Sequence, residues 1–531
     1  MRCKQARCPD HGPPLARPPG TVIESIRPRR RSVHRTTPPP PFALTARVCR
    51  ARPRTTFGLH VTTDLTTGKP LRLILTFTLP LLAGLVLQQL YHLADAVVVG
   101  RTLGIQALAA VGATGSIAFL LLGFTMGMTN GFAIPVARAF GAGDADAVRR
   151  SVAVGAVLSA IVAAGLTLVG IPLSRQLLIW MATPAELLDG ATIFMAVTFA
   201  GCSAGIAFNY LSGIIRALGD SRTPLMFLAV SSVLNVGLVL LLVGGTSMGI
   251  AGAALATVLA QLATVVACLA LIARRMPLLR PRRADWRLRR ADVVESLRLG
   301  LPMGFQMSII AIGTLVLQYA INRLGPDAVA AFAAASRVDA LAMTPYQAFG
   351  MAIATYVAQN RGAGQWSRIR QGVTQTAWLS VGVALAVGLA CILWGTSMVR
   401  VFAGHDAHAE AILADAHTLL LVNGLLYFTL GLLFVFRSAL QGLGHAGIPT
   451  FSGVVELVLR SAAALVLVTP LGFLGAVLAA PLAWVGALVP LWISWEARRR
   501  ALTPLPDEPP LGAFPGGVTP AELAESDQTR S

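Results

Sequence analysis

The chain is poor in charged residues, and this scarcity excludes most soluble folds. Only 13% of its 531 residues are Asp, Glu, Lys or Arg, whereas 55% are hydrophobic, and the mean hydropathy is +0.68. A soluble domain carries roughly 25% charged residues. The chain therefore has too little polar surface to be solvated on all sides, and its composition predicts an integral membrane protein.

Acidic residues are scarcer than basic ones, which leaves a net charge of +19. Most Lys and Arg lie in an N-terminal tail and in short breaks between apolar runs, the pattern by which charge orients a helical bundle in a bilayer. We therefore expect membrane lipid as a partner and no nucleic acid.

Cysteine is also scarce, with six residues in the chain. They have neither the pattern of a disulfide framework nor the spacing of a structural zinc site. The apolar runs contain no His-Glu-x-x-His motif, paired aspartates or Ser/His constellation, which are the signatures that an intramembrane enzyme would need. We expect no metal, no cofactor and no enzymatic activity.

Residues 1–60 are rich in Pro and Arg and lack the apolar segment of a secretory signal peptide. We expect a disordered basic extension. An organelle transit peptide and a lipid-binding arm are alternatives, but an over-extended gene start fits better, because the chain from Val61 resembles a natural beginning.

From Leu71 onward, apolar runs of about 20–28 residues alternate with short polar breaks, and each run is long enough to cross a bilayer. They predict twelve spans near residues 71–95, 107–134, 151–174, 190–213, 225–245, 249–273, 300–322, 328–357, 373–397, 411–436, 450–470 and 472–495. The expected domains are an N-lobe at 61–273, a basic cytoplasmic linker at 274–299, a C-lobe at 300–497 and a disordered tail at 498–531.

Arginines concentrate on one side of these spans. The linker and the other breaks on its side of the membrane are arginine-rich, whereas the opposite side offers little beyond Arg101, Arg175, Arg323 and Arg400. The positive-inside rule predicts that both termini and the linker are cytoplasmic, in a multi-pass protein of the cell inner (plasma) membrane.

The two halves of the chain repeat one another. Leu103-Gly104 matches Leu324-Gly325, and Gly141-Ala142-Gly143 matches Gly362-Ala363-Gly364 at the same offset. Each half holds an even number of spans, so both halves enter from the same side. The expected fold is all-α, with two six-helix bundles related by a pseudo-two-fold axis along the membrane normal and a cavity between them.

The landmarks of this repeat belong to a longer ordered set of motifs. They resemble multidrug and toxic compound extrusion (MATE) transporters, closest to the bacterial DNA-damage-inducible-F-like branch, over roughly residues 61–500. The motifs are Gln88-Gln89-Leu90-Tyr91, Gly100-Arg101-Thr102-Leu103-Gly104, Arg216-Ala217-Leu218-Gly219-Asp220 and Ala358-Gln359-Asn360-Arg361. The resemblance implies a two-lobed antiporter that exports organic, often cationic, compounds in exchange for protons or sodium.

Asp95 is the leading candidate for an ion-binding residue. Gln88, Tyr91 and His92 share its helical face and form a polar stripe, and charge inside a bilayer marks function by default. The resemblance implies that Asp95 binds the coupling ion. We predict a cation or proton site of Asp95, Gln88, Tyr91 and Asn235, with His92 facing the substrate cavity. The simpler alternative is a solvated Asp near a helix end.

The choice of coupling ion depends on which acids are missing. Asn235 matches an amide of the family's N-lobe cation site, but Val239 stands where an aspartate is expected. The seventh span offers Gln306 in place of an acid. A hard cation needs several oxygens with compensating charge, so protons are favoured over sodium.

The other polar residues inside the spans have either a functional or a structural interpretation. We predict that Arg337, Asp339 and Gln306 line a cavity or gate. Asn209 either lines the cavity or forms a helix–helix hydrogen bond. Glu456 and Arg460 have the spacing of an intrahelical ion pair, and Arg437 is expected to extend towards the membrane surface.

The predicted function is an ion-coupled antiporter of small molecules, with no obligatory protein partner evident. A flippase for lipid-linked sugars or peptidoglycan precursor is the alternative. An intramembrane enzyme is a remoter one.

Overall fold

The computed structural model describes residues 64–181, 183–246, 248–400 and 409–501, and the side chains of a few further residues in these ranges, His92 and Asp95 among them, are not described. The predicted extension at 1–60 and nearly all of the predicted tail at 498–531 lie outside these ranges.

Over the described residues the chain forms twelve α-helices, which confirms the predicted all-α fold. Their bounds are α1 Pro70–Leu103, α2 Ile105–Gly141, α3 Ala145–Trp180, α4 Ala185–Ala217, α5 Arg222–Val239, α6 Gly249–Arg275, α7 Arg290–Asn322, α8 Pro326–Gly362, α9 Trp366–Arg400, α10 Ala409–Gly442, α11 Gly447–Leu471 and α12 Phe473–Ala501.

Most helices are longer than the predicted spans, because hydropathy detects only their apolar middle. The third predicted span begins at residue 151, whereas α3 begins at Ala145. Its polar first turn is stabilised by Asp144, whose carboxylate accepts a hydrogen bond from the Ala147 amide at 2.8 Å, a standard N-cap.

By length and composition, eleven helices in the described residues could cross a membrane. The exception is α8, which carries Arg337, Asp339 and several amides along its length. Its 37 residues would still extend about 55 Å. We attribute its low hydropathy to contacts inside the protein, which are described below.

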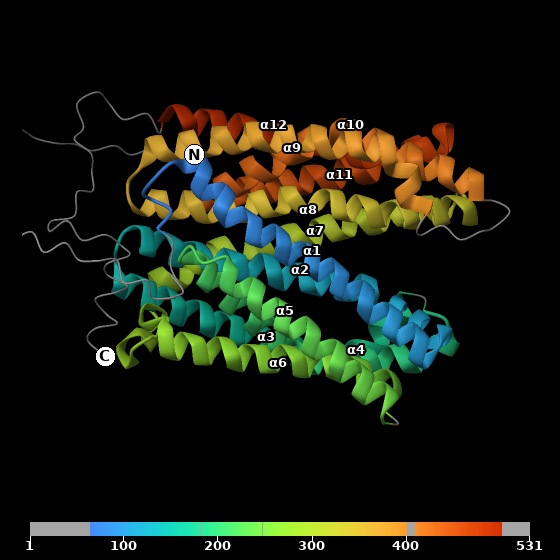
Figure 1. Cartoon of the computed structure of the whole chain (residues 1–531), viewed down its shortest axis with the longest axis horizontal. Helices are drawn as coiled ribbons and strands as arrows, with labels where there is room; N and C mark the ends of the chain where they lie inside the picture. The colour runs from blue at the N-terminus through green and yellow to red at the C-terminus, as the bar shows by residue number, and fades with distance from the viewer. Residues whose placement is uncertain (1–63, 182, 247, 401–408, 502–531) are drawn as a thin grey trace, which may run out of the picture. The chain divides into compact units, whose positions relative to one another are not determined.

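The helices pack as two bundles, α1–α6 and α7–α12 (Figure 1). In the first bundle α4 packs on α2, α3 and α6; in the second α10 packs on α8, α9 and α12. The bundles meet where α2 packs on α7 and α8, and where α1 packs on α8. Close approach of α2 and α7 depends on small residues, since a Cβ on Gly131 would lie 2.6 Å from the Gly300 Cα.

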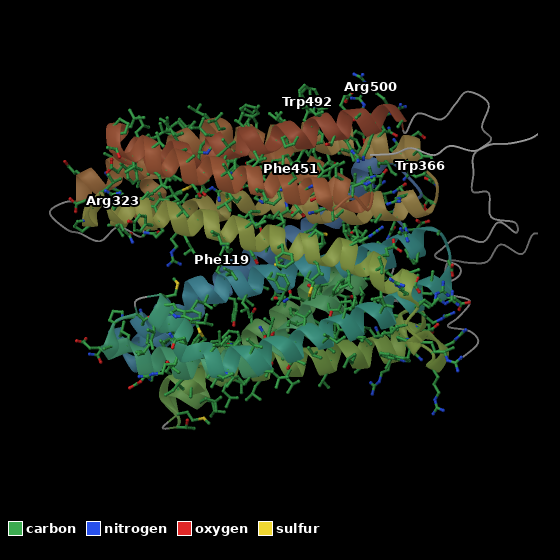
Figure 2. The ribbon with its side chains drawn as sticks, turned by 180° about the vertical axis from the view of Figure 1, so that it is seen from behind. Phe119, Arg323, Trp366, Phe451, Trp492 and Arg500 are labelled. Carbon is green, nitrogen blue, oxygen red and sulfur yellow. The ribbon has the colours of Figure 1, made fainter. Side chains whose placement is uncertain are left out.

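Large apolar side chains face outward along the helices. Leu168 and Val233 are each 75% exposed, and Trp378 is 73% exposed. Trp492 projects from α12 in the same way (Figure 2). Such a surface is stable against hydrocarbon rather than water, as the composition predicts.

The two ends of the paired bundles differ in sequence. Trp366 and Arg500 lie at one end and Arg323 at the other (Figure 2). The first end also carries the connection between α6 and α7, where arginines surround the short turns Pro277–Leu279 and Arg283–Trp286. We call it the arginine-rich end.

Candidate ion and substrate sites

The predicted ion site is only partly described. His92 and Asp95 belong to α1, but their side chains lie outside the described residues. Gln88 and Tyr91 lie on the same helix and are half-buried. The site at Asp95 therefore stays a prediction, and the neighbouring helices supply the geometry that bears on it.

Asn235 on α5 is buried and belongs to a polar pair. Its Nδ2 donates to Thr257 Oγ1 on α6 at 3.0 Å. Its Oδ1 is buried, and no described residue donates to it. A buried acceptor without a donor is unusual in a native structure, so this oxygen is available to a cation, a proton carrier or water. Sequence reasoning missed Thr257, because a lone Thr in an apolar helix usually bonds only its own backbone.

Val239, at the position where an acid was expected, is buried in the same lobe, packed with Val99, Val243 and Ala253. An apolar residue there supplies no oxygen ligand.

Two predicted cavity residues make structural contacts. Asn209 donates to the Gly205 carbonyl on its own helix at 3.0 Å. Gln306 on α7 is fully buried; it donates to the Pro449 carbonyl at 3.0 Å and accepts from Gln441 at 2.9 Å. Gln306 therefore joins α7 to α11 and α10, and its predicted role at a cavity or gate stays a prediction.

Asp339 faces the tenth helix. Its Oδ1 accepts hydrogen bonds from Asn423 Nδ2 at 2.9 Å and from the Tyr427 hydroxyl at 2.7 Å. Arg337, two residues earlier on α8, is exposed, so the two charges point to different sides. The Oδ1 of Asn423 is buried without a donor among the described residues.

We predict that Tyr427→Phe lowers the free energy of unfolding by about 1–3 kcal/mol, because the hydrogen bond from its hydroxyl to the Asp339 carboxyl is lost inside the protein. Thermal unfolding of the purified protein measures this. Tyr319→Phe is the matched control, since Tyr319 is 61% exposed. Equal midpoints for both variants would contradict the assigned hydrogen bond.

Three charges form a buried cluster in the second bundle. Glu456 on α11 lies 2.8 Å from Arg437 on α10 and 2.7 Å from Arg460 one turn along its own helix. All three are at most 7% exposed. The expectation that Arg437 reaches the membrane surface is wrong, because a carboxylate from the neighbouring helix holds its guanidinium inside the protein.

The two bundles approach most closely at the arginine-rich end, where α2 and α8 end. A Cβ on Gly141 would lie 2.0 Å from the Gln359 carbonyl oxygen, and one on Gly362 would lie 1.9 Å from the Arg138 carbonyl oxygen. Gly141 and Gly362 are equivalent in the internal repeat. The crossing is therefore symmetric, and it brings backbone against backbone.

Residues 64–69, which precede α1, reinforce this contact. The Leu65 amide donates to Gln359 Oε1 at 3.1 Å, and Arg368 donates to the Gly68 carbonyl at 2.7 Å. Gln359 Nε2 in turn donates to the Ala217 carbonyl at the end of α4 at 2.8 Å. Residues 64–69 thus contact the end of α8 and the first turn of α9. Gln359 also connects α8 to the end of α4 in the first bundle.

Within the described residues, no group of three or more His, Cys, Asp or Glu side chains could hold a metal ion. The buried oxygens without a donor among the described residues include Asn235 Oδ1 in the first bundle and Asn423 Oδ1 in the second. Such oxygens suit a proton or a monovalent cation better than a transition metal.

Comparison with known proteins agrees with this architecture. A family model described as MatE matches residues 80–241 and 302–466, one segment in each half of the chain. The probable multidrug resistance protein YpnP of Bacillus subtilis is 28% identical over 306 residues, covering 58% of this chain and 68% of that protein.

The probable multidrug resistance protein NorM of Thermotoga maritima is 25% identical over 412 residues, covering 76% of this chain and 87% of that protein. Among solved structures, the crystal structure of MATE in complex with MaL6 has a TM-score of 0.77 at 23% identity, covering 84% of this chain and 99% of that chain. The structural match shows a shared fold of two helical bundles.

Proposed function

The chain belongs to the MatE family, and on this premise we propose that it exports small organic compounds, cationic or amphiphilic, across the inner membrane by ion-coupled antiport. The observation that carries the proposal is the symmetric crossing of α2 and α8. Two repeat-related bundles meet at one end through glycines, and a contact of this kind is able to open and re-form as the bundles rock.

We place the arginine-rich end, with both termini, in the cytoplasm, because the distribution of arginine favours this orientation. The structure then represents a state closed towards the cytoplasm. Opening inward requires separating Gly141 from Gln359 and Gly362 from Arg138. It also requires breaking the hydrogen bond between Gln359 and Ala217.

The proposed coupling ion is a proton, bound at Asp95 in the first bundle. The unpaired Oδ1 of Asn235 supports an ion-binding role for this region, and Val239 supports a proton over sodium because it supplies no carboxylate. Protonation of Asp95 from outside changes α1 and drives substrate release. The bundles then return to the cytoplasm-open state, and the proton leaves inward.

A flippase for lipid-linked sugars or peptidoglycan precursor is less well supported. A pyrophosphate-bearing substrate needs several cations in the central cavity. Arg437 and Arg460 are buried and paired with Glu456, which leaves Arg337 on α8. Translocation of a fluorescent lipid-linked substrate in reconstituted vesicles would reverse this preference.

The export proposal is tested by measuring the resistance of a host strain, one that lacks its own exporters, to toxic organic compounds. We expect the wild-type chain to raise the inhibitory concentration of several cationic or amphiphilic compounds, and Asp95→Asn to abolish this. Asp189→Asn is the matched control, because its side chain is 82% exposed and forms an ion pair with exposed Arg175. Resistance to no compound in a broad panel would refute export of this substrate class.

A further inference from the structure

A cavity of about 430 Å³ lies at the arginine-rich end, away from the predicted ion site. It is bounded by the end of α2, the beginnings of α3, α7 and α9, and the end of α8. Its volume is many times the roughly 30 Å³ that one water molecule occupies in the liquid. The cavity is therefore large enough for a small polar ligand.

The charged residues of the lining balance one another. Three are arginines, Arg138, Arg150 and Arg361, and three are acids, Asp144, Asp292 and Glu295. A wall of zero net charge offers no advantage to a simple anion or a simple cation. It favours a ligand that carries both signs of charge a few ångströms apart.

One ion pair in the wall is loose. Arg150 Nε and Asp292 Oδ2 lie 3.7 Å apart, and both atoms are buried without a hydrogen-bond partner among the described residues. Arg138 and Glu295, by contrast, are directly hydrogen-bonded. These two atoms face each other and are closed to a ligand, but the side chains as a whole are 24% and 30% exposed. The other guanidinium nitrogens of Arg150 and the other carboxylate oxygen of Asp292 are therefore open to a guest that accepts from Arg150 and donates to Asp292.

We propose that this cavity binds a phosphoethanolamine group, either free or as the headgroup of a phospholipid. The phosphate accepts hydrogen bonds from Arg150, for which the guanidinium geometry is well suited. The ammonium donates to Asp292 and lies near Trp366, whose ring face attracts cations.

The ligand joins the two bundles. Arg150 belongs to α3 in the first bundle, whereas Asp292 and Trp366 belong to α7 and α9 in the second. The cavity exists in this form only while the arginine-rich end is closed. A ligand that binds one state of an equilibrium stabilises that state, so phosphoethanolamine favours the closed end.

The test measures the thermal unfolding of the purified full chain in detergent against increasing phosphoethanolamine. Phosphocholine is the discriminating probe, because it has the same charges but its quaternary ammonium has no N–H to donate. Inorganic phosphate serves as the simple anion. We expect stabilisation by phosphoethanolamine at concentrations at least about tenfold lower than for either other ligand, a difference of about 1.4 kcal/mol.

Two variants assign the effect to the cavity. Asp292→Asn should remove the preference for phosphoethanolamine over phosphocholine, and Arg150→Gln should remove stabilisation by both. Arg175→Gln is the control, since Arg175 lies in an exposed ion pair outside the cavity. The unfolding midpoint without ligand shows whether each variant is folded.

Nanodiscs distinguish the two sources of the ligand. Stabilisation by phosphatidylethanolamine over phosphatidylglycerol and phosphatidylcholine, with no effect of the free headgroup, supports a lipid ligand; an effect of both supports headgroup recognition alone. Equal responses to phosphoethanolamine and phosphocholine would overturn the proposal, as would no response to either form of phosphoethanolamine.

Discussion

Replacing Glu456 by Ala is expected to lower the free energy of unfolding by about 3–5 kcal/mol. Arg437 and Arg460 would then remain buried without a counter-ion, and removing one partner of a buried ion cluster carries a penalty of this size. Both guanidiniums also have an Nε that is buried without an acceptor among the described residues, so the wall around them cannot replace the lost carboxylate. Thermal or denaturant unfolding of the purified protein measures the change.

Two controls separate loss of the charge from loss of volume. Glu496→Ala removes an acid that pairs with Arg499 and Arg500 in exposed positions, and we expect an effect below about 1 kcal/mol. Replacing Arg437, Glu456 and Arg460 together by Met should cost less than Glu456→Ala alone, because no unpaired charge remains. A change below about 1 kcal/mol for Glu456→Ala would contradict the assigned cluster.

Gly141→Ala is expected to hold the arginine-rich end open. The added Cβ would lie 2.0 Å from the backbone oxygen of Gln359, and a backbone atom inside a packed helix cannot move aside as a flexible side chain does. Overpacking of this kind costs about 1–3 kcal/mol, which shifts the equilibrium from the closed state towards the open one by about 5- to 150-fold. Gly362→Ala should act in the same way from the other bundle, where the Cβ would lie 1.9 Å from the Arg138 oxygen.

The opening can be followed with a cysteine at Ala358, which is fully buried at this interface. In a background without the native cysteines, a membrane-impermeant maleimide should label this position faster in Gly141→Ala than in the wild type. Gly112→Ala, on the same helix as Gly141, is the control, because no atom lies within 4 Å of the position of a Cβ added at Gly112. Equal labelling in all three proteins would show that the crossing does not hold this end closed.

The fold could be predicted from the sequence because the bilayer leaves few alternatives. Backbone polar groups in hydrocarbon must be paired within a helix, so each apolar run predicts a helix whatever surrounds it. Even α8 was predicted, from the apolar run at 328–357, although its composition falls short of a typical span. The repeat also predicts equivalent positions for Gly141 and Gly362, but not that each lies against the other's helix.

Contacts between helices could not be predicted in this way. Arg437 lies near the end of an apolar run, which indicates a side chain that reaches the surface; only the packing of α10 on α11 brings Glu456 to it. The bonds of Gln306 to Pro449 and Gln441 could not be predicted either, because both partners lie on other helices. Residues 64–69 look like an unremarkable polar leader, because their partners are almost 300 residues away.

The central claim is that protons drive export through Asp95. The most direct measurement is substrate-dependent proton flux in proteoliposomes that contain the wild-type chain or Asp95→Asn. We predict proton movement that depends on substrate in the wild type and is abolished in Asp95→Asn, with no requirement for sodium. Unchanged coupled flux in Asp95→Asn, or export that needs sodium and moves no protons, would contradict it.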